Sequence, residues 1–168
     1  MKVISKKVFW ILIPFILLTQ SCGIYSFTGG STGAMKTVSV QFFENNAPLV
    51  VPNLSQQFTE ALKARIRNQS SLSITRDNAD GNFEGRITDY SIKPVAVTGS
   101  EIAEATRISI TVSVKFTNAL DNEQSFEMPF TRFTEVRGSN VQAQEQAQIL
   151  LINAMLTEDI YNRAFANW

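Results

Sequence analysis

Apolar and polar residues alternate most strictly between residues 107 and 118 of the chain. The apolar positions of this segment are Ile108, Ile110, Val112, Val114 and Phe116. The residues between them are polar, so the two kinds of side chain would lie on opposite faces of a strand. The pattern predicts a strand with one face in the core and the other facing solvent.

Weaker alternation predicts further strands on both sides of this one. We expect them over residues 37–43, 72–76, 83–97 and 125–136. In the earliest segment, Val38, Val40 and Phe42 are expected to share the buried face. The long segment that begins at residue 83 changes phase near Asp89, which predicts a β-bulge there.

Two segments have the periodicity of amphipathic helices. In residues 53–69 apolar positions recur at intervals of three and four, and Asn53 or Ser55 is available as the N-cap. The final stretch of the chain reads as a long helix that begins after Ser139 or Asn140. Both helices are therefore expected to lay an apolar side on the sheet.

The middle of the final helix, residues 149–156 (ILLINAML), carries no charge and is apolar nearly all around the helix. A helix of this kind is usually covered on more than one side. It is buried between the sheet and the first helix, or a partner protein covers its outer side, and both explanations stay open at this point.

The predicted order of elements is β-α-β-β-β-β-α, which indicates an α+β fold. Layer packing places the two helices on one face of a four- to five-stranded mixed, mostly antiparallel sheet. The other face, rich in serine and threonine, is left for solvent or a partner.

The N-terminus has the order of an export signal. Lys2, Lys6 and Lys7 precede an uncharged apolar run of 11 residues (8–18), and the single cysteine, Cys22, follows. The run is too short to span a bilayer as a helix, which needs about 20 residues. We interpret Cys22 as a site of lipid attachment that carries diacylglycerol and acyl chains; the alternative is an ordinary signal peptide with a leftover thiol.

This interpretation divides the chain into a lipoprotein signal peptide (1–21), a lipidated flexible tether (22–36) and one α+β domain (37–168). No acidic residue directly follows Cys22, so an acidic retention signal for the inner membrane is missing. We therefore expect a lipid-anchored protein on the periplasmic side of the outer membrane.

Composition excludes several kinds of activity. The chain has no histidine, so His-dependent catalysis and His-based metal sites are impossible. It has 15 basic and 15 acidic residues, and three of the basic ones belong to the signal peptide, so the mature part is mildly acidic. Such a charge argues against a nucleic-acid partner. We predict no enzyme activity, no metal and no cofactor other than the lipid on Cys22.

Taken together, several segments resemble the LptE family of lipopolysaccharide-assembly lipoproteins of the outer membrane. They are residues 35–45, 54–66, 83–97, 107–118, 130–136 and 158–168. The resemblance implies a protein that sits inside the large β-barrel LptD, helps it to assemble and supports lipopolysaccharide transport to the outer leaflet.

The resemblance also directs attention to basic residues near the long hairpin loop and before the last helix. The loop of this chain contains Glu101 and Glu104 and no basic residue, so Arg107, Arg132 and Arg137 remain as candidate lipopolysaccharide contacts.

A partner interface is expected near the C-terminal end of the chain. Its candidate residues are Leu150, Leu151, Tyr161 and Trp168.

Two other functions are weighed against this one. The alternative is a periplasmic lipoprotein that regulates a cell-envelope enzyme such as a peptidoglycan synthase, although the tether is short for reaching across the periplasm. A hydrolase that uses paired acids, Glu101 with Glu104 or Glu158 with Asp159, ranks last.

Overall fold

The computed structural model describes residues 32–96, 104–138 and 140–166. The predictions for the signal peptide, for Cys22 and most of the tether, and for Trp168 lie outside these residues.

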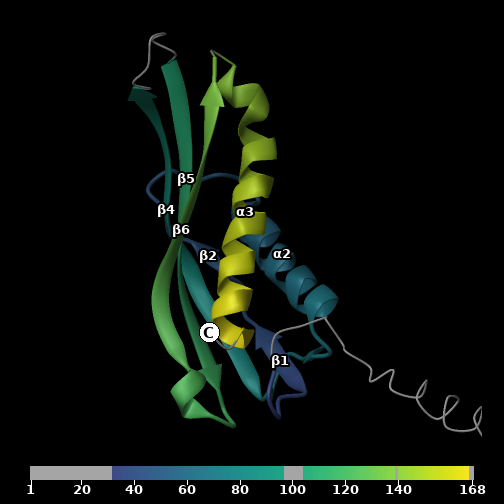
Figure 1. Cartoon of the computed structure of the whole chain (residues 1–168). Coiled ribbons are helices and arrows are strands. Elements are labelled where there is room, and N and C mark those ends of the chain that lie inside the picture. Colours follow the sequence, from purple (N-terminus) through teal and green to yellow (C-terminus); the bar gives the residue numbers. More distant parts are fainter. Residues whose placement is uncertain (1–31, 97–103, 139, 167–168) are drawn as a thin grey trace, which may run out of the picture.

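One mixed sheet forms the first layer of the fold, with its long strands running almost the length of the molecule (Figure 1). Its strands are β1 (Thr37–Val40), β2 (Glu44–Asn45), β3 (Ser73–Ile74), β4 (Gly81–Ala96), β5 (Glu104–Asn118) and β6 (Phe126–Arg137). The strand order is β3-β1-β4-β5-β6, and β2 also pairs with β4. The long pairs β4–β5 and β5–β6 are antiparallel, whereas the short strands pair in parallel.

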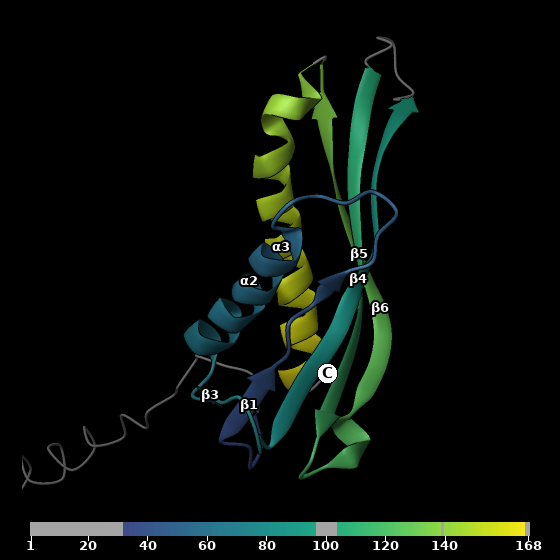
Figure 2. The same ribbon diagram turned by 180° about the vertical axis from the view of Figure 1, so that it is seen from behind.

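Two helices, α2 (Leu54–Gln69) and α3 (Val141–Phe165), form the second layer. Both lie on the same face of the sheet, and α3 runs along β5 and β6 (Figures 1 and 2). The predicted α+β class and the two helices on a mixed sheet are thus confirmed. The short β2 raises the number of strands to six.

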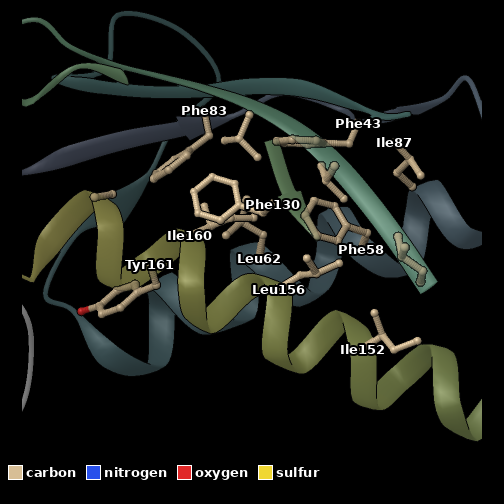
Figure 3. Packing of buried hydrophobic residues seen from close by; sticks show 14 of the residues in the cluster. Phe43, Phe58, Leu62, Phe83, Ile87, Phe130, Ile152, Leu156, Ile160 and Tyr161 are labelled. Atoms are coloured by element: carbon tan, nitrogen blue, oxygen red, sulfur yellow. The ribbon is translucent and has the colours of Figure 1, made fainter. Parts of the chain in front are cut away.

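The core fills the space between these layers. The predicted apolar face of β5 is buried from Ile108 to Phe116, and it belongs to one core cluster with residues of both helices. Figure 3 shows Phe58 of α2 and Ile160 of α3 in this cluster. Aromatic rings pack in the core near the C-terminal end of α3, where the ring centres of Phe165 and Phe116 lie 5.7 Å apart. The strict alternation along β5 was therefore a reliable guide to the buried face.

The first strand is shorter than predicted, and the prediction for Phe42 was wrong. Phe42 is 59% exposed, whereas Phe43 is completely buried. The register explains the change, because Val40 pairs with Phe83 and Glu44 with Arg86. Four steps along β1 and β2 match three along β4, and the extra residue turns the following side chains to the opposite face.

The bulge predicted near Asp89 is confirmed. The β4–β5 register shifts between Ile87 and Asp89, so burial passes from Ile87 to Tyr90. Helix starts agree with the predicted positions, since Asn53 and Asn140 are the N-cap residues of α2 and α3. Neither side chain makes a capping hydrogen bond.

Candidate binding surfaces

The described residues contain no group of three or more Cys, Asp or Glu side chains placed to hold a metal ion. Within the same residues, no helix is long and apolar enough to cross a membrane. The features that remain for function are surfaces: the outer face of the sheet and the outer side of the helices.

The outer face of the sheet is built from polar pairs that lie opposite each other on neighbouring strands. Lys115 contacts Glu84 at 2.7 Å, and the hydroxyls of Thr111 and Thr131 are 2.9 Å apart. The hydrogen bond to Glu84 raises the pKa of Lys115. Cross-strand pairs of this kind stabilise the sheet and leave a hydrophilic, water-compatible surface.

Arg107 belongs to this outer face. Its Nε and Nη2 atoms donate to Oε1 of Glu135 at 3.1 and 2.7 Å, and its guanidinium lies 4.2 Å from the centre of the Phe133 ring. The side chain is thus held in a defined position, with its charge partly balanced by one carboxylate.

Two further cations share the face with Arg107. Lys93 is its register partner on β4, and Arg137 lies on β6 two residues beyond Glu135. Both are exposed, and neither forms an ion pair within the described residues. Sequence reasoning missed Lys93, because only the β4–β5 register brings it beside Arg107.

Arg132 lies on the opposite, helix-covered face, as shown by its pairing with the buried Ile110. It donates to both carboxylate oxygens of Asp159 on α3, at 2.6 and 2.7 Å, and this contact raises the pKa of Arg132. Arg107, Arg132 and Arg137 therefore do not form one cluster. Arg132 connects β6 with α3.

The structure distinguishes the two sides of the apolar segment of α3. Ile149 and Ile152 are buried, but Leu150 and Leu151 are 55% and 54% exposed. The core of this chain therefore covers only one side of the apolar segment of α3. The two leucines form an exposed pair on the outer side of α3.

Tyr161, which was expected at a partner interface, is only 4% exposed. Its hydroxyl donates to the backbone oxygen of Gln69 at 2.6 Å, and its ring lies 5.1 Å from that of Phe165. Figure 3 shows Tyr161 among the side chains of the core. Tyr161 joins the end of α2 to α3 and is part of the core. Helical spacing could not distinguish a core residue from an interface residue, since both roles place Tyr161 on an apolar side of the helix.

A groove of about 320 Å³ runs between the helices, with Leu150 at its edge and Ala61 and Ala154 in its walls. Arg65 of α2 donates to the backbone oxygen of Ala154 at 2.9 Å. Asn153 is 1% exposed, and neither its side-chain nitrogen nor its oxygen has a hydrogen-bond partner among the residues that the structure describes.

Known proteins resemble the chain over most of its length. The model of a family described as LptE, lipopolysaccharide-assembly, matches residues 35–164. No curated protein matches in sequence.

Solved structures with a similar fold include a minor lipoprotein from Acinetobacter baumannii, with 15% identity and a TM-score of 0.47 over 77% of this chain and 91% of that one. Rare lipoprotein B from Shewanella oneidensis has 10% identity and a TM-score of 0.46 over 76% and 90%. The PelC dodecamer from Paraburkholderia phytofirmans has 11% identity and a TM-score of 0.49 over 83% and 96%.

Proposed function

Since the chain belongs to the LptE family of lipopolysaccharide-assembly proteins, we propose that it is an outer-membrane lipoprotein that fills the lumen of an LptD-like β-barrel. There it supports assembly of the barrel and delivery of lipopolysaccharide to the outer leaflet. The observation that carries the proposal is the family match over residues 35–164, which includes all six strands, α2 and all but the last residue of α3.

The LptE family is a non-enzymatic lipoprotein family, so membership confirms the prediction that the chain is not an enzyme. The function of the chain therefore depends on surfaces that bind other molecules. The proposed anchor is the lipid on Cys22, in the periplasmic leaflet of the outer membrane. Its support is the position of the only cysteine, directly after the apolar run and before non-acidic residues.

Two surfaces fit a barrel lumen. The lumen of a membrane β-barrel is polar, and the outer face of the sheet offers hydroxyls such as Thr111 and Thr131 together with paired charges such as Glu84 with Lys115. On the other side of the molecule, the exposed leucine pair of α3 supplies apolar area for a tighter contact.

For lipopolysaccharide, the proposed contact is the outer face near the β4–β5 hairpin end, at Lys93, Arg107 and Arg137. Cations on one face can hold the phosphate groups of a lipid by charge-assisted hydrogen bonds. Arg132 is left out of this contact, because Asp159 already holds it. The double variant Lys93→Ala/Arg137→Ala is expected to bind purified lipopolysaccharide less tightly than the wild type, and Arg86→Ala as tightly.

The proposal is tested by isolating the tagged protein from detergent-solubilised outer membranes and identifying bound proteins by mass. A large β-barrel recovered in a one-to-one ratio is the expected result. Recovery of a periplasmic synthase without a barrel would contradict it and favour the regulator of a cell-envelope enzyme.

A further inference from the structure

A second cationic site lies far from the hairpin end, in a pocket of about 530 Å³ beside β3. Three separate segments contribute to it: the residues at the end of β1, α2 between Glu60 and Arg67, and the end of β3 with the loop that follows it. Lys63 and Arg67 come from α2, and Arg76 comes from the loop.

The charges of the pocket are unevenly paired. Lys63 is bound by Glu60 at 2.9 Å, and Asp77 is the other carboxylate in the lining. Arg67 and Arg76 are exposed and form no ion pair with any residue that the structure describes. The pocket therefore presents two guanidinium groups that are available to an anion.

One more feature suits a ligand at this place. The ring of Phe42, displaced to the surface by the extra residue after β1, is 59% exposed at the pocket. It offers an apolar contact beside the two guanidinium groups.

The helix dipole alone does not explain these cations. From the sequence, Lys63, Arg65 and Arg67 are explained either as an anion-binding patch or, the favoured explanation, as cations that suit the C-terminal end of α2. In the structure Arg65 turns to α3, whereas Lys63 and Arg67 join Arg76, which is not part of the helix. The grouping comes from tertiary structure.

The pocket lies at the end of the molecule where the described chain begins. The backbone N–H of Ser73 donates to the oxygen of Lys36 and that of Thr75 to the oxygen of Val38, both at 2.9 Å. Figure 2 shows β3, β1 and the end of α2 together at this end, with the β4–β5 hairpin end opposite. Thr32 lies ten positions after Cys22 in the chain, a span of at most about 35 Å.

We propose that this pocket binds the phosphate of an anionic phospholipid in the leaflet that holds the lipid of Cys22. The inference rests on the proposed anchor. Paired guanidinium groups match the geometry of phosphate oxygens, and an aromatic ring such as that of Phe42 is favoured at the membrane interface. Together with the lipid, the pocket gives a second membrane contact at the end of the domain where the described chain begins.

The test uses the chain from residue 22 onward with Cys22→Ser, so that no acyl chain contributes to binding. All core residues lie between Met35 and Phe165, and thermal unfolding confirms that each variant is folded. Co-sedimentation is measured with vesicles of phosphatidylcholine alone and with vesicles that contain 30 to 40% phosphatidylglycerol. Each cation near an anionic surface contributes roughly fivefold in affinity, so Arg67→Ala/Arg76→Ala is expected to bind about 30-fold more weakly to the anionic vesicles.

The matched control is Arg86→Ala/Arg163→Ala, which removes the same charge at two exposed positions that do not line the pocket. Specific loss in the pocket variant supports the proposal. Equal loss in both variants would overturn it, as would no binding at all to anionic vesicles. Binding of inorganic phosphate as tight as that of vesicles, or binding only to phosphatidylcholine vesicles that contain lipopolysaccharide, would also overturn it. None of these results depends on the barrel, so the proposed function is tested separately.

Discussion

Asp80 ties the first described strand to the long hairpin. Its Oδ2 accepts hydrogen bonds from the backbone N–H groups of Lys36 and Thr37, at 2.8 and 2.9 Å. These two hydrogen bonds lower the pKa of Asp80 below its ordinary value of 3.8, and the bond from Lys36 has the largest effect. A carboxyl group with a lowered pKa stabilises the fold above its ordinary pKa, and this contribution is lost as the pH falls through the lowered value.

The variant Asp80→Asn tests this link. It keeps an oxygen acceptor but loses the charge, so we expect a lower urea midpoint than the wild type at pH 7. The difference should shrink as the pH falls below 3.8, because the wild-type carboxyl then becomes protonated. Urea unfolding at pH 7 and at pH values from 4 downward measures it, and a difference independent of pH would contradict the explanation.

Gly85 is required by close packing. A Cβ atom at this position would overlap the backbone oxygen of Ser113 and lie 2.7 Å from the ring of Phe43. Gly85→Ala is expected to reduce the free energy of unfolding by about 3 kcal/mol. Gly81→Ala is the control, with a smaller loss, since a Cβ there meets only the side chains of Phe116 and Met35. Equal losses of unfolding free energy in both variants would show that overlap with the Ser113 oxygen is not the cause of the destabilisation.

Asn153 is buried, and its side-chain amide has no hydrogen-bond partner within the described part of the chain, which costs free energy. Asn153→Leu, a change to an apolar side chain of related shape, is expected to raise the free energy of unfolding by about 1–2 kcal/mol. Thr157→Val serves as control, because the Thr157 hydroxyl already donates to Ala154 and its removal should not stabilise the protein. A loss of stability in Asn153→Leu would mean that the amide makes stabilising hydrogen bonds.

At the scale of elements, the periodicity of apolar residues predicts those features that depend on a single segment. The strand β5, the helices α2 and α3 and the bulge near Asp89 each follow from the spacing of apolar residues along one segment. The class of the fold followed from their order. What the spacing could not supply is the relation between segments that are distant in sequence.

Three misses share this cause. Phe42 changed face because β1 and β2 pair with β4 in different registers. Lys93 joins Arg107 only through the β4–β5 pairing, and Tyr161 is buried because the end of α2 lies against it. In each case a contact between elements, rather than the pattern within one, determines exposure.

The exposed leucine pair of α3 is predicted to contact the partner. Leu150→Asp or Leu151→Asp should leave the free energy of unfolding of the isolated protein within about 1 kcal/mol of the wild type, because both side chains are exposed. Recovery of the barrel in the isolation experiment should fall about tenfold, as for loss of an apolar contact at an interface.

The neighbouring residue Ile152 supplies the control for this prediction. It is completely buried, so Ile152→Asp should unfold the protein, since an unpaired charge cannot be accommodated in the core. Normal barrel recovery by a folded Leu150→Asp and a folded Leu151→Asp would remove this side of α3 from the interface.

At the scale of the whole molecule, the surfaces are arranged along and around one elongated body. The described chain begins at one end, beside the pocket of Arg67 and Arg76, and Lys93 and Arg137 lie towards the other end (Figure 1). Between the ends, the polar outer face of the sheet and the exposed leucine pair of α3 lie on opposite sides of the molecule. A protein surrounded by a barrel would use both sides, whereas a regulator docked on an enzyme needs only one.

The most direct measurement places a photoactivatable cross-linker at Thr131 on the outer sheet face and, separately, at Leu150 on α3, in cells. Both positions are exposed and lie on opposite sides of the molecule. The account predicts that both cross-link to the same large β-barrel. Cross-links from one side only, or to a periplasmic enzyme from either, would contradict the claim that the protein fills a barrel lumen.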